Sequence, residues 1–291
     1  MRVLVTGGAG YIGSHAVRAL VAEGHEVKVL DNLSNGHREA IVDEGVELVV
    51  GEMADEALVE KLFAGFQPEA VMHFAAFIEV GESVQEPLKY YRNNVAAPLV
   101  VLEAMQRHDC RRFIFSSTCA TYGVPDVVPI EETEKQAPIN PYGWSKFMLE
   151  RILADCERGW GLKSIFLRYF NASGAAFDGQ IGEAHDPETH LIPRIMMALR
   201  GEIDRLQIFG TDYDTPDGTC IRDYIHVEDL AAAHLAALRF LVKEGRSECF
   251  NLGTGSGISV REILDATEKV TGEEAPVDFG PRREGDSPRL I

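Results

Sequence analysis

The sequence predicts an α/β protein with a Rossmann-type, doubly wound parallel sheet and a smaller C-terminal α/β substrate domain. Three observations lead to this fold class. Short apolar runs alternate with helical patterns through the first 170 residues, and a glycine-rich turn separates the first run from the first helical pattern. Beyond residue 170 the alternation weakens. Strands that alternate with helices form βαβ units, so helices are expected to cover both faces of the sheet.

The predicted strands of this sheet are brief and rich in β-branched and aromatic residues. We expect strands at residues 2–6, 26–30, 46–50, 70–74, 112–116 and 163–168, with helices at 12–23, 55–64, 94–107 and 143–158. Each strand is a nearly continuous apolar run, which is typical of strands that are buried on both faces.

The C-terminal part has a different pattern. Residues 171–190, rich in Gly, Asp, Ala and His, are expected to form a loop before a helix at 191–201. Residues 223–242 predict a short strand and a strong helix, and 259–272 predict a helix that Gly272 ends. We therefore assign residues 1–170 to a nucleotide-binding domain and 171–291 mostly to a substrate domain. Residues 222–242 are expected to return to the first domain.

Charge and cysteine content limit the classes of partner. The 291 residues include 46 acidic and 28 basic side chains, a formal net charge of −18. A binding surface for nucleic acid needs a basic face, so nucleic acid is not expected as a partner. The cysteines are odd in number, widely spread and without a C-x-x-C pair, which predicts reduced thiols in a cytoplasmic protein and no metal site. No signal peptide or membrane-length apolar run is seen, so no membrane partner is expected.

The glycine-rich turn predicts a dinucleotide site. In "VTGGAGYIGSH", Gly7, Gly10 and Gly13 are spaced three apart, directly after a strand and at the start of a helix. Glycines there allow a tight turn and close approach of a pyrophosphate to the helix N-terminus. Asp31 stands at the end of the second predicted strand, where a carboxylate binds ribose hydroxyls and repels a 2′-phosphate. This favours NAD over NADP.

A tyrosine and a lysine stand one helical turn apart in "NPYGWSK". Tyr142 and Lys146 share a helix face, so one interpretation is that they are solvated neighbours. The other is that the ammonium lowers the pKa of the phenol and makes it a general acid/base. Ser116, Ser117 and Thr118 follow the fifth predicted strand, at the edge where ligands bind in open α/β sheets.

The order of glycine loop, strand-end hydroxyl and Y-x-x-x-K resembles the extended short-chain dehydrogenase/reductase family. Within it, "GGAGYIGSH", "DNLSNG", "VGESVQEPLKYYRNNV", "NPYGWSK", "LRYFNASGA", "DGTCIRDYIHVEDLA", "FNLGTGSGISV" and "RREGDSPR" together look like the UDP-glucose 4-epimerases. These motifs span nearly the whole chain, and "LRYFN" and "RDYIHVEDLA" are especially specific.

The resemblance implies a role for each matching residue. Tyr142 is the general base, Lys146 its partner and binder of the nicotinamide ribose, and Thr118 the hydroxyl that binds the sugar O4. NAD contacts Gly7, Gly10, Tyr11, Ile12, Gly13, Asp31, Asn32, Asn35, Glu52, Met53, Phe74, Ala75, Asn93, Tyr142, Lys146 and Phe170. The UDP-sugar contacts Thr118, Tyr142, Asn171, His190, Leu191, Arg222, Arg283, Asp286 and Leu290.

Some residues depart from the family pattern or have a simpler explanation. Ile78 stands where some members have a lysine near the phosphates, and Glu52 replaces an aspartate near the adenine. Members continue for some tens of residues beyond the position of Ile291, so the C-terminus is expected to be incomplete. His73 and His226 are expected to pack in the core or at strand ends rather than to act in catalysis. Without a ligand, His190 would be a loop residue and Arg222 a surface residue paired with Asp223.

The resemblance implies reversible epimerisation at C4 of UDP-glucose and UDP-galactose through a 4-keto sugar, with NAD tightly bound. Another sugar of the same nucleotide class is the nearest alternative, and a non-catalytic NAD-binding regulator is a more distant one. A 4,6-dehydratase would need an Asp-Glu pair after Thr118, where this chain has Cys119 and Ala120. Decarboxylases that use a nearby glutamate are disfavoured in the same way.

Two further expectations concern assembly and sugar range. Leu149, Ile152, Leu153 and Cys156 lie at helical spacing and form either a core-facing stripe or the face of a homodimer. Family members pair through the helices at 94–107 and 143–158, which favours the dimer. The resemblance also places Leu290 beside the C2 substituent of the sugar. Because leucine is shorter than tyrosine, UDP-N-acetylhexosamines are expected to be accepted as well.

Overall fold

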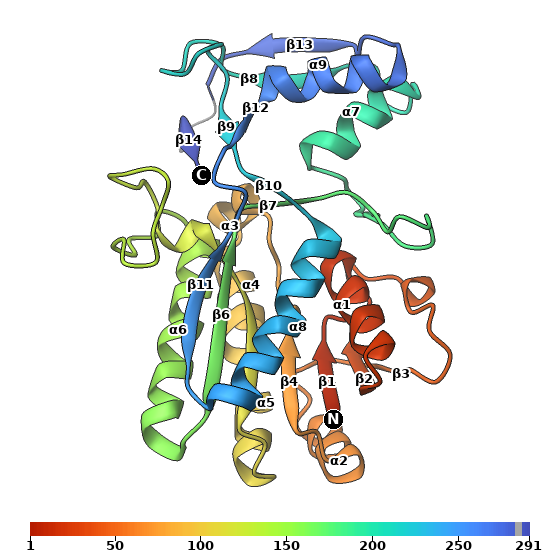
Figure 1. Ribbon diagram of the computed structural model, residues 1–291, viewed down its shortest axis with the longest axis vertical. Coiled ribbons are helices and arrows are strands. Elements are labelled where there is room, and N and C mark those ends of the chain that lie inside the picture. The colour runs from red at the N-terminus through yellow and green to blue at the C-terminus, as the bar shows by residue number, and fades with distance from the viewer. Residues whose placement is uncertain (283–286) are drawn as a thin grey trace.

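A seven-stranded parallel sheet forms the centre of the computed structural model, which describes residues 1–282 and 287–291. The strand order is β11-β6-β5-β4-β1-β2-β3. The strands are β1 (Arg2–Thr6), β2 (Glu26–Asp31), β3 (Glu47–Val50), β4 (Ala70–His73), β5 (Arg112–Thr118), β6 (Lys163–Tyr169) and β11 (Glu248–Leu252). The chain runs outward from β1 to β3 and then returns to β4 on the other side of β1 (Figure 1). This reversal is the switch point of a doubly wound sheet, so the predicted fold class is confirmed.

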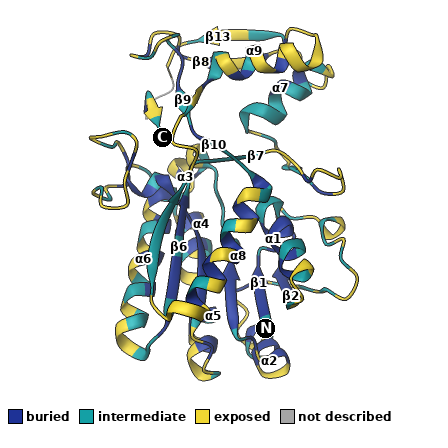
Figure 2. Cartoon of the chain, in the orientation of Figure 1, coloured by how far each residue is buried: buried dark blue, intermediate teal, exposed yellow. Residues whose placement is uncertain are grey.

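Helices cover both faces of the sheet. One face is covered by α1 (Tyr11–Ala22) and α8 (Val227–Glu244), and the other by α2 (Glu56–Phe66), α5 (Ala97–Arg107) and α6 (Pro141–Trp160). Each layer contributes to its own apolar core, and the strands between the two cores are buried (Figure 2). The near-continuous apolar runs of the sequence are thus explained by burial on both sides.

The structure adds elements that the sequence patterns did not predict. Strand β11 pairs with β6 at the sheet edge, and all of its residues are only partly buried, so its apolar signal is weak. Two short helices, α3 (Val80–Gln85) and α4 (Pro87–Tyr91), precede a π-helical turn at Arg92–Ala96. The helix predicted at 94–107 therefore begins at Ala97. Residues 171–190 are mostly loop, as expected, apart from the short β7 (Asn171–Ser173).

A second group of elements lies beyond the carboxyl ends of the sheet strands, at the top of Figure 1. It contains α7 (Leu191–Leu199), α9 (Val260–Thr271), β8 (Leu206–Phe209) and β13 (Val277–Gly280), which share a separate apolar core. Short pairings connect it to the rest, namely β10 (Tyr224–His226) with β7, and β9 (Ile221–Arg222) with β12 (Ile258–Ser259) and β14 (Arg289–Leu290). The domain boundary at residue 170 stays a prediction.

Local sequence signals account for the helix ends that shape this second group. Ser259 caps α9 in a capping box with Glu262, and Gly272 ends the helix in the left-handed conformation with φ of 78°.

All five cysteines are free thiols. Among the residues described, no helix combines the length and the apolar character needed to cross a membrane.

Candidate active site

One large cavity opens at the carboxyl ends of the sheet strands and continues toward the second group of elements. Its volume is ≈ 1410 Å³. Of the site residues predicted from the sequence, Arg283 and Asp286 lie outside the described residues, and the rest line this cavity. They are Gly7, Gly10, Tyr11, Ile12, Gly13, Asp31, Asn32, Asn35, Glu52, Met53, Phe74, Ala75, Asn93, Thr118, Tyr142, Lys146, Phe170, Asn171, His190, Leu191, Arg222 and Leu290.

The glycine loop is packed too tightly for side chains. Gly7 has φ of +74°, and a Cβ there would lie 2.4 Å from the backbone nitrogen of Ala75. A Cβ on Gly13 would lie 2.1 Å from the Gly7 carbonyl oxygen. At Gly10, the N-cap of α1, no side chain caps the helix and an added Cβ meets nothing closer than 3.4 Å. The first N–H groups of α1 therefore suit an anion in the cavity, which fits the pyrophosphate of a dinucleotide.

Two acidic residues mark the adenosine side of the cavity. Asp31 is 8% exposed, and its carboxylate accepts the backbone N–H groups of Ala9 at 2.9 Å and Leu33 at 2.8 Å. Each carboxylate oxygen keeps a second lone pair, so ribose hydroxyls can still donate to it. The Asn32 amide donates to Glu52 at 3.1 Å, which keeps this longer acid at the cavity wall.

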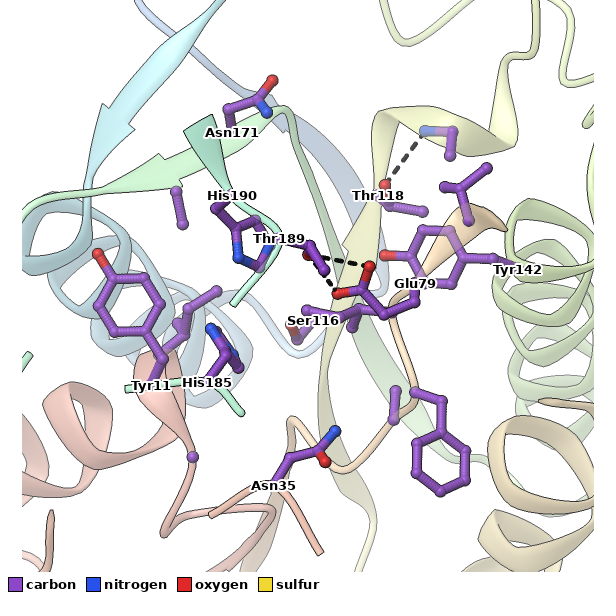
Figure 3. A pocket seen from close by; sticks show the side chains of 18 of the residues that line it. Tyr11, Asn35, Glu79, Ser116, Thr118, Tyr142, Asn171, His185, Thr189 and His190 are labelled. Carbon is purple, nitrogen blue, oxygen red and sulfur yellow. Dashed lines mark hydrogen bonds between the residues drawn. The ribbon is translucent and has the colours of Figure 1, made fainter. Parts of the chain in front are cut away.

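The start of α6 places Tyr142. Asn140 caps the helix by accepting the Gly143 N–H at 2.8 Å, and Pro141 occupies the first turn. A Cβ on Gly143 would lie 2.6 Å from the Ala120 carbonyl oxygen, so the helix start packs closely against the turn after β5. As a result, the phenol of Tyr142 lies beside the hydroxyl of Thr118, which accepts the Ala120 N–H at 3.2 Å (Figure 3).

Lys146 lies one turn along α6 and is 4% exposed. Its Nζ donates to the Ser116 carbonyl oxygen at 2.9 Å and lies 6.0 Å from the centroid of the Tyr142 ring. Burial lowers the pKa of Lys146 to about 7, although the nearby Glu150 carboxylate acts in the opposite direction. Burial also raises the pKa of Tyr142 above its ordinary value. Burial is the largest influence on the pKa of Tyr142 in this structure, and the lowering of that pKa by Lys146 stays a prediction.

A buried polar network supports this pair from behind. Glu150 and Arg168 form an ion pair at 2.7 Å, with side chains 3% and 5% exposed. The Glu150 carboxylate also accepts the Ser117 hydroxyl at 2.6 Å, and Arg168 donates to the Tyr122 hydroxyl at 2.8 Å. The network joins α6 to β5 and β6 and so fixes the strand end that carries Thr118. Of these residues, only Ser117 is predicted from the sequence, as a strand-end hydroxyl, because the others are joined by contacts between distant segments.

The opposite wall is formed by the segment before α7. The Thr189 hydroxyl donates to the Glu79 carboxylate at 2.9 Å, which joins this segment to the residues before α3 (Figure 3). The carboxylates of Glu183 and Glu188 raise the pKa of His190 to about 9. The Nδ1 atom of this imidazole lies 2.9 Å from Glu183 Oε1 and 2.8 Å from Glu188 Oε1. His190 was predicted from the sequence, whereas Glu183, His185 and Glu188 were not, although the spacing E-x-H-x-x-E-x-H is a visible signal.

The remaining predicted residues lie on the side of the second group. The Arg222 guanidinium donates to the Ser287 carbonyl oxygen at 2.9 Å. The backbone N–H of Asn171 donates to the Asp223 carbonyl oxygen at 3.0 Å. Leu290 packs near Phe170 in a small apolar cluster.

The two histidines that were expected to be structural have packing roles. His73 is 1% exposed and its Nδ1 lies 2.7 Å from the Thr6 hydroxyl. His226 caps α8.

The model of the NAD dependent epimerase/dehydratase family matches residues 3–253. The chain belongs to this family.

Among its members, a UDP-glucose 4-epimerase of Rhizobium meliloti (strain 1021) is 52% identical, over 99% of this chain and 88% of the relative. The crystal structure of UDP-glucose 4-epimerase from Brucella ovis in complex with NAD is 52% identical with a TM-score of 0.96, covering 99% of this chain and 88% of that one. The UDP-Glc/GlcNAc 4-epimerase of Campylobacter jejuni is 46% identical with a TM-score of 0.86, covering 100% and 89%.

Proposed function

We propose that this chain interconverts UDP-glucose and UDP-galactose by epimerisation at C4, with NAD as a bound cofactor. The observation that carries the proposal is the meeting of Tyr142, Thr118 and Lys146 in the cavity that the glycine loop also lines. A proton acceptor, an orienting hydroxyl and a dinucleotide site thus share one space. The family relationship and the NAD-bound relative support the same activity.

The glycine loop, Asp31 and Glu52 would hold NAD, as their geometry above indicates. When bound, NAD would supply the hydride-transfer chemistry at C4 of the sugar, and its oxidised nicotinamide would add a positive charge. Because the cofactor is regenerated in each cycle, turnover needs no added NAD.

The proton follows a path between named atoms. Thr118 and Tyr142 bind the O4 hydroxyl, and the phenolate of Tyr142 removes its proton as hydride leaves C4. Lys146 supports the phenolate when it carries a proton, since a positive charge favours the ionised phenol. After the keto sugar has turned, Tyr142 returns the proton to O4. The net reaction leaves the enzyme and the cofactor unchanged.

Cationic and amide side chains on the far wall suit the UDP portion. Arg222 and His190 line the cavity, and the planar guanidinium of Arg222 makes bidentate bonds to phosphate. Asn171 and Leu191 lie beside them. We retain Arg283 and Asp286 in the proposed binding set, although they lie outside the described residues.

Dehydration is a poorer match to the site. The residue after Thr118 is Cys119, whose thiol is 7% exposed and has a pKa raised to about 12 by burial. Such a group cannot act as the acid that expels a hydroxyl.

The decisive assay mixes the protein with UDP-galactose, without added NAD, and measures UDP-glucose. Absence of product from protein that retains NAD would overturn the proposed activity and favour a non-catalytic NAD-binding role.

We extend the proposed substrates to UDP-N-acetylhexosamines because of Leu290. Its backbone pairs with Arg222 through β14 and β9, and its side chain lies at the cavity wall. Leu290→Tyr should lower kcat/KM for UDP-N-acetylglucosamine more than for UDP-glucose. Arg289→Tyr is the matched control, because the neighbouring residue on the same strand is exposed. Equal loss of both activities in Leu290→Tyr, or no N-acetyl activity in the unmodified protein, would contradict this substrate range.

We also propose a homodimer, with an interface formed by residues other than the stripe at Leu149, Ile152, Leu153 and Cys156. Leu149 and Leu153 are fully buried in the core of this chain, and Ile152 and Cys156 pack against it, so that stripe faces inward. The outer surface instead exposes an apolar set from α3, α4, α5 and α6: Val84 (62%), Leu88 (64%), Leu99 (38%), Trp144 (39%) and Met148 (38%). An apolar surface of this kind is typical of a contact between subunits.

Light scattering at micromolar concentration tests the dimer. The unmodified chain should have twice the monomer mass, and Met148→Glu should shift it toward the monomer because the charge would be buried in the interface. Val270→Glu provides the control, since Val270 is 84% exposed on α9. A monomeric mass for the unmodified chain would contradict the dimer.

A further inference from the structure

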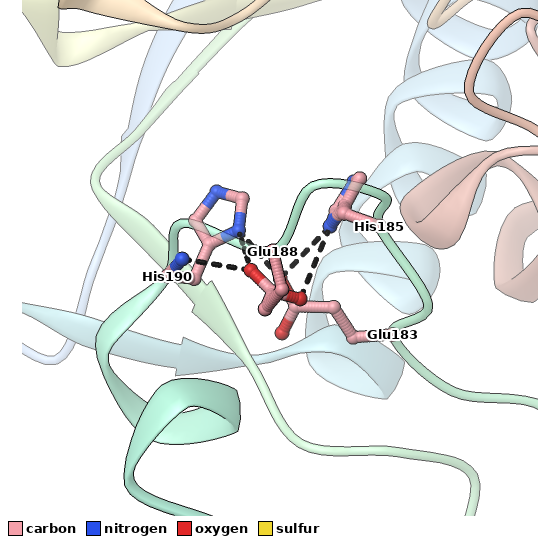
Figure 4. A group of neighbouring side chains, drawn as sticks. All are labelled: Glu183, His185, Glu188 and His190. Atoms are coloured by element: carbon pink, nitrogen blue, oxygen red, sulfur yellow. Dashed lines mark hydrogen bonds and ion pairs between the residues drawn. The ribbon is translucent and has the colours of Figure 1, made fainter. Parts of the chain in front are cut away.

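Two histidines and two glutamates of the segment before α7 point toward one another (Figure 4). Their potential ligand atoms all lie within 4.8 Å of one another. His190 Nδ1 lies 2.8 Å from Glu188 Oε1 and 2.9 Å from Glu183 Oε1. His185 Nδ1 lies 3.2 Å from Glu183 Oε1 and 3.7 Å from Glu188 Oε2. The proposed reaction uses only His190 of this cluster, and it does not need the other three side chains.

These separations match the edges of a small coordination tetrahedron. Zinc–nitrogen and zinc–oxygen bonds of about 2.0–2.2 Å give ligand–ligand edges of about 3.3 Å in tetrahedral geometry. The three distances that join Glu183 Oε1 and Glu188 Oε2 to the histidine Nδ1 atoms, 2.9, 3.2 and 3.7 Å, lie on both sides of that value. Each histidine presents Nδ1 to the centre, and each glutamate presents a carboxylate oxygen. An ion at the centre would therefore require only small movements of the side chains.

The surroundings orient the ligands in the way that outer contacts of metal sites do. The Glu188 Oε1 atom accepts the backbone N–H groups of Thr189 and His190, each at 2.7 Å, which fixes the carboxylate and leaves Oε2 for the centre. His37 Nε2 lies 2.6 Å from the Ala184 carbonyl oxygen and holds the start of the segment. The side chains of Glu183 and Glu188 are 8% and 7% exposed, and two nearly buried carboxylates side by side favour a cation between them.

We propose that Glu183, His185, Glu188 and His190 form a binding site for one Zn²⁺ ion. Mixed imidazole and carboxylate ligands suit zinc, whereas Mg²⁺ and Ca²⁺ prefer oxygen alone. The ion has a positioning role: it holds the segment that begins α7 against the cofactor loop, where the ring of His185 meets that of Tyr11 edge-on at 6.2 Å. This site does not depend on the proposed reaction.

Cobalt is the probe for the first experiment. The full-length protein is stripped of metal with a chelator and titrated with Co²⁺. The expected result is a set of strong visible bands typical of four-coordinate Co²⁺, saturating at one ion per chain and abolished by Zn²⁺. A roughly hundred-fold excess of Zn²⁺ over its Kd should also raise the Tm by about 4 °C. Absence of the bands would overturn the proposal.

Variants locate the ion. His185→Gln and Glu188→Gln each remove a ligand and should weaken Zn²⁺ binding by at least ~10–100-fold in competition with a chromophoric chelator. His37→Gln is the matched control, because it contacts the same segment without facing the cluster. Unchanged binding in both ligand variants, or equal loss in the control, would contradict the assignment. If the ligand variants fail to fold, X-ray absorption of the Zn²⁺-loaded parent protein decides. Two imidazoles and oxygen ligands support the site, and sulfur ligands overturn it.

Discussion

Replacing Lys146 by methionine removes the buried amine beside the proposed base while keeping a side chain of similar length. The Nζ atom of Lys146 donates to the Ser116 carbonyl oxygen, and burial lowers its pKa to about 7. Below that pH both Lys146 and Tyr142 hold their protons. The Tyr142–Lys146 pair can accept the O4 proton only after one of its two members has lost a proton. The pH dependence of kcat/KM should therefore follow the deprotonation of the Lys146 ammonium.

The expected size of the effect follows from these pKa values. In the unmodified enzyme, kcat/KM should reach a plateau above pH 7 and fall to about one tenth at pH 6 and about one hundredth at pH 5. In Lys146→Met, the proton must leave Tyr142 itself, and burial raises the pKa of that phenol above its ordinary value of 10.0. At pH 8 the phenolate fraction is then below about one in a hundred. The variant should therefore lose at least ~100-fold at pH 8 and recover about tenfold per pH unit up to pH 10.

The assay is the pH profile of kcat/KM with UDP-galactose from pH 5 to 10, with the NAD content measured at each pH. Lys89→Met is the matched control, since Lys89 lies in a surface ion pair with Glu82 and is 40% exposed. If kcat/KM of Lys146→Met still falls below pH 7 as it does in the unmodified enzyme, a group other than Lys146 sets this pH dependence. That result would refute the role of Lys146. The test depends on the pH at which kcat/KM falls and not on its absolute value, so partial loss of NAD does not affect the conclusion.

The shifted pKa of Lys146 also has a consequence for stability. The folded pKa of about 7 lies below the ordinary value of 10.5, so between these pH values the unfolded chain binds a proton that the folded chain does not. The contribution of Lys146 to the free energy of unfolding therefore rises with pH across this window. Lys146→Met should flatten that rise, as measured by denaturant unfolding at pH 6, 8 and 10. An unchanged pH dependence would show that Lys146 keeps its proton in the folded protein.

Three other substitutions test the site and its support. Tyr142→Phe should lower kcat by ~10²–10⁴-fold with NAD still bound, and a rate above a tenth of the parent would exclude Tyr142 as the base. Gly7→Ala should lose NAD and destabilise the fold by more than the ~1–3 kcal/mol of backbone strain, because the new Cβ meets backbone atoms. The control Gly24→Ala has a similar φ of +77° but open space around the Cβ, so it should cost only the backbone strain. Arg168→Met leaves the buried Glu150 unpaired and should cost ~3–5 kcal/mol, or roughly 5–8 °C in Tm, and adding Glu150→Met should restore much of it. Equal Tm values for the single and double variants would contradict that reasoning.

The fold was largely predictable because its core strands carry strong local signals. Strands β1 and β4 each contain an uninterrupted apolar run, at residues 3–5 and 70–72, because helices pack on both faces of the sheet. Strand β11 lacks this signal because it lies at the edge and is only partly buried. The helices α3 and α4 are too short to show a helical period, so their formation depends on packing against α6.

The candidate site was predictable where local backbone geometry demands a particular residue. Gly7 and Gly13 have no room for a side chain, and such positions leave a spacing that can be read directly. The contact between Thr189 and Glu79 joins segments that are far apart in the sequence, and no periodic pattern records it. Its prediction would need the packing of the second group of elements on the first.

Charge states are less accessible to sequence reasoning than positions, and the Tyr142–Lys146 pair shows why. Their spacing places both side chains on one face of α6, which is a property of the helix alone. Their pKa values depend instead on how much water the surrounding elements exclude, and these elements include β5 and the turn after it. Desolvation disfavours both the phenolate and the ammonium, so an isolated helix and the folded protein give opposite directions for the pKa of Tyr142. The positive charge of bound NAD would favour the phenolate, so Tyr142 becomes a competent base when the cofactor is in place.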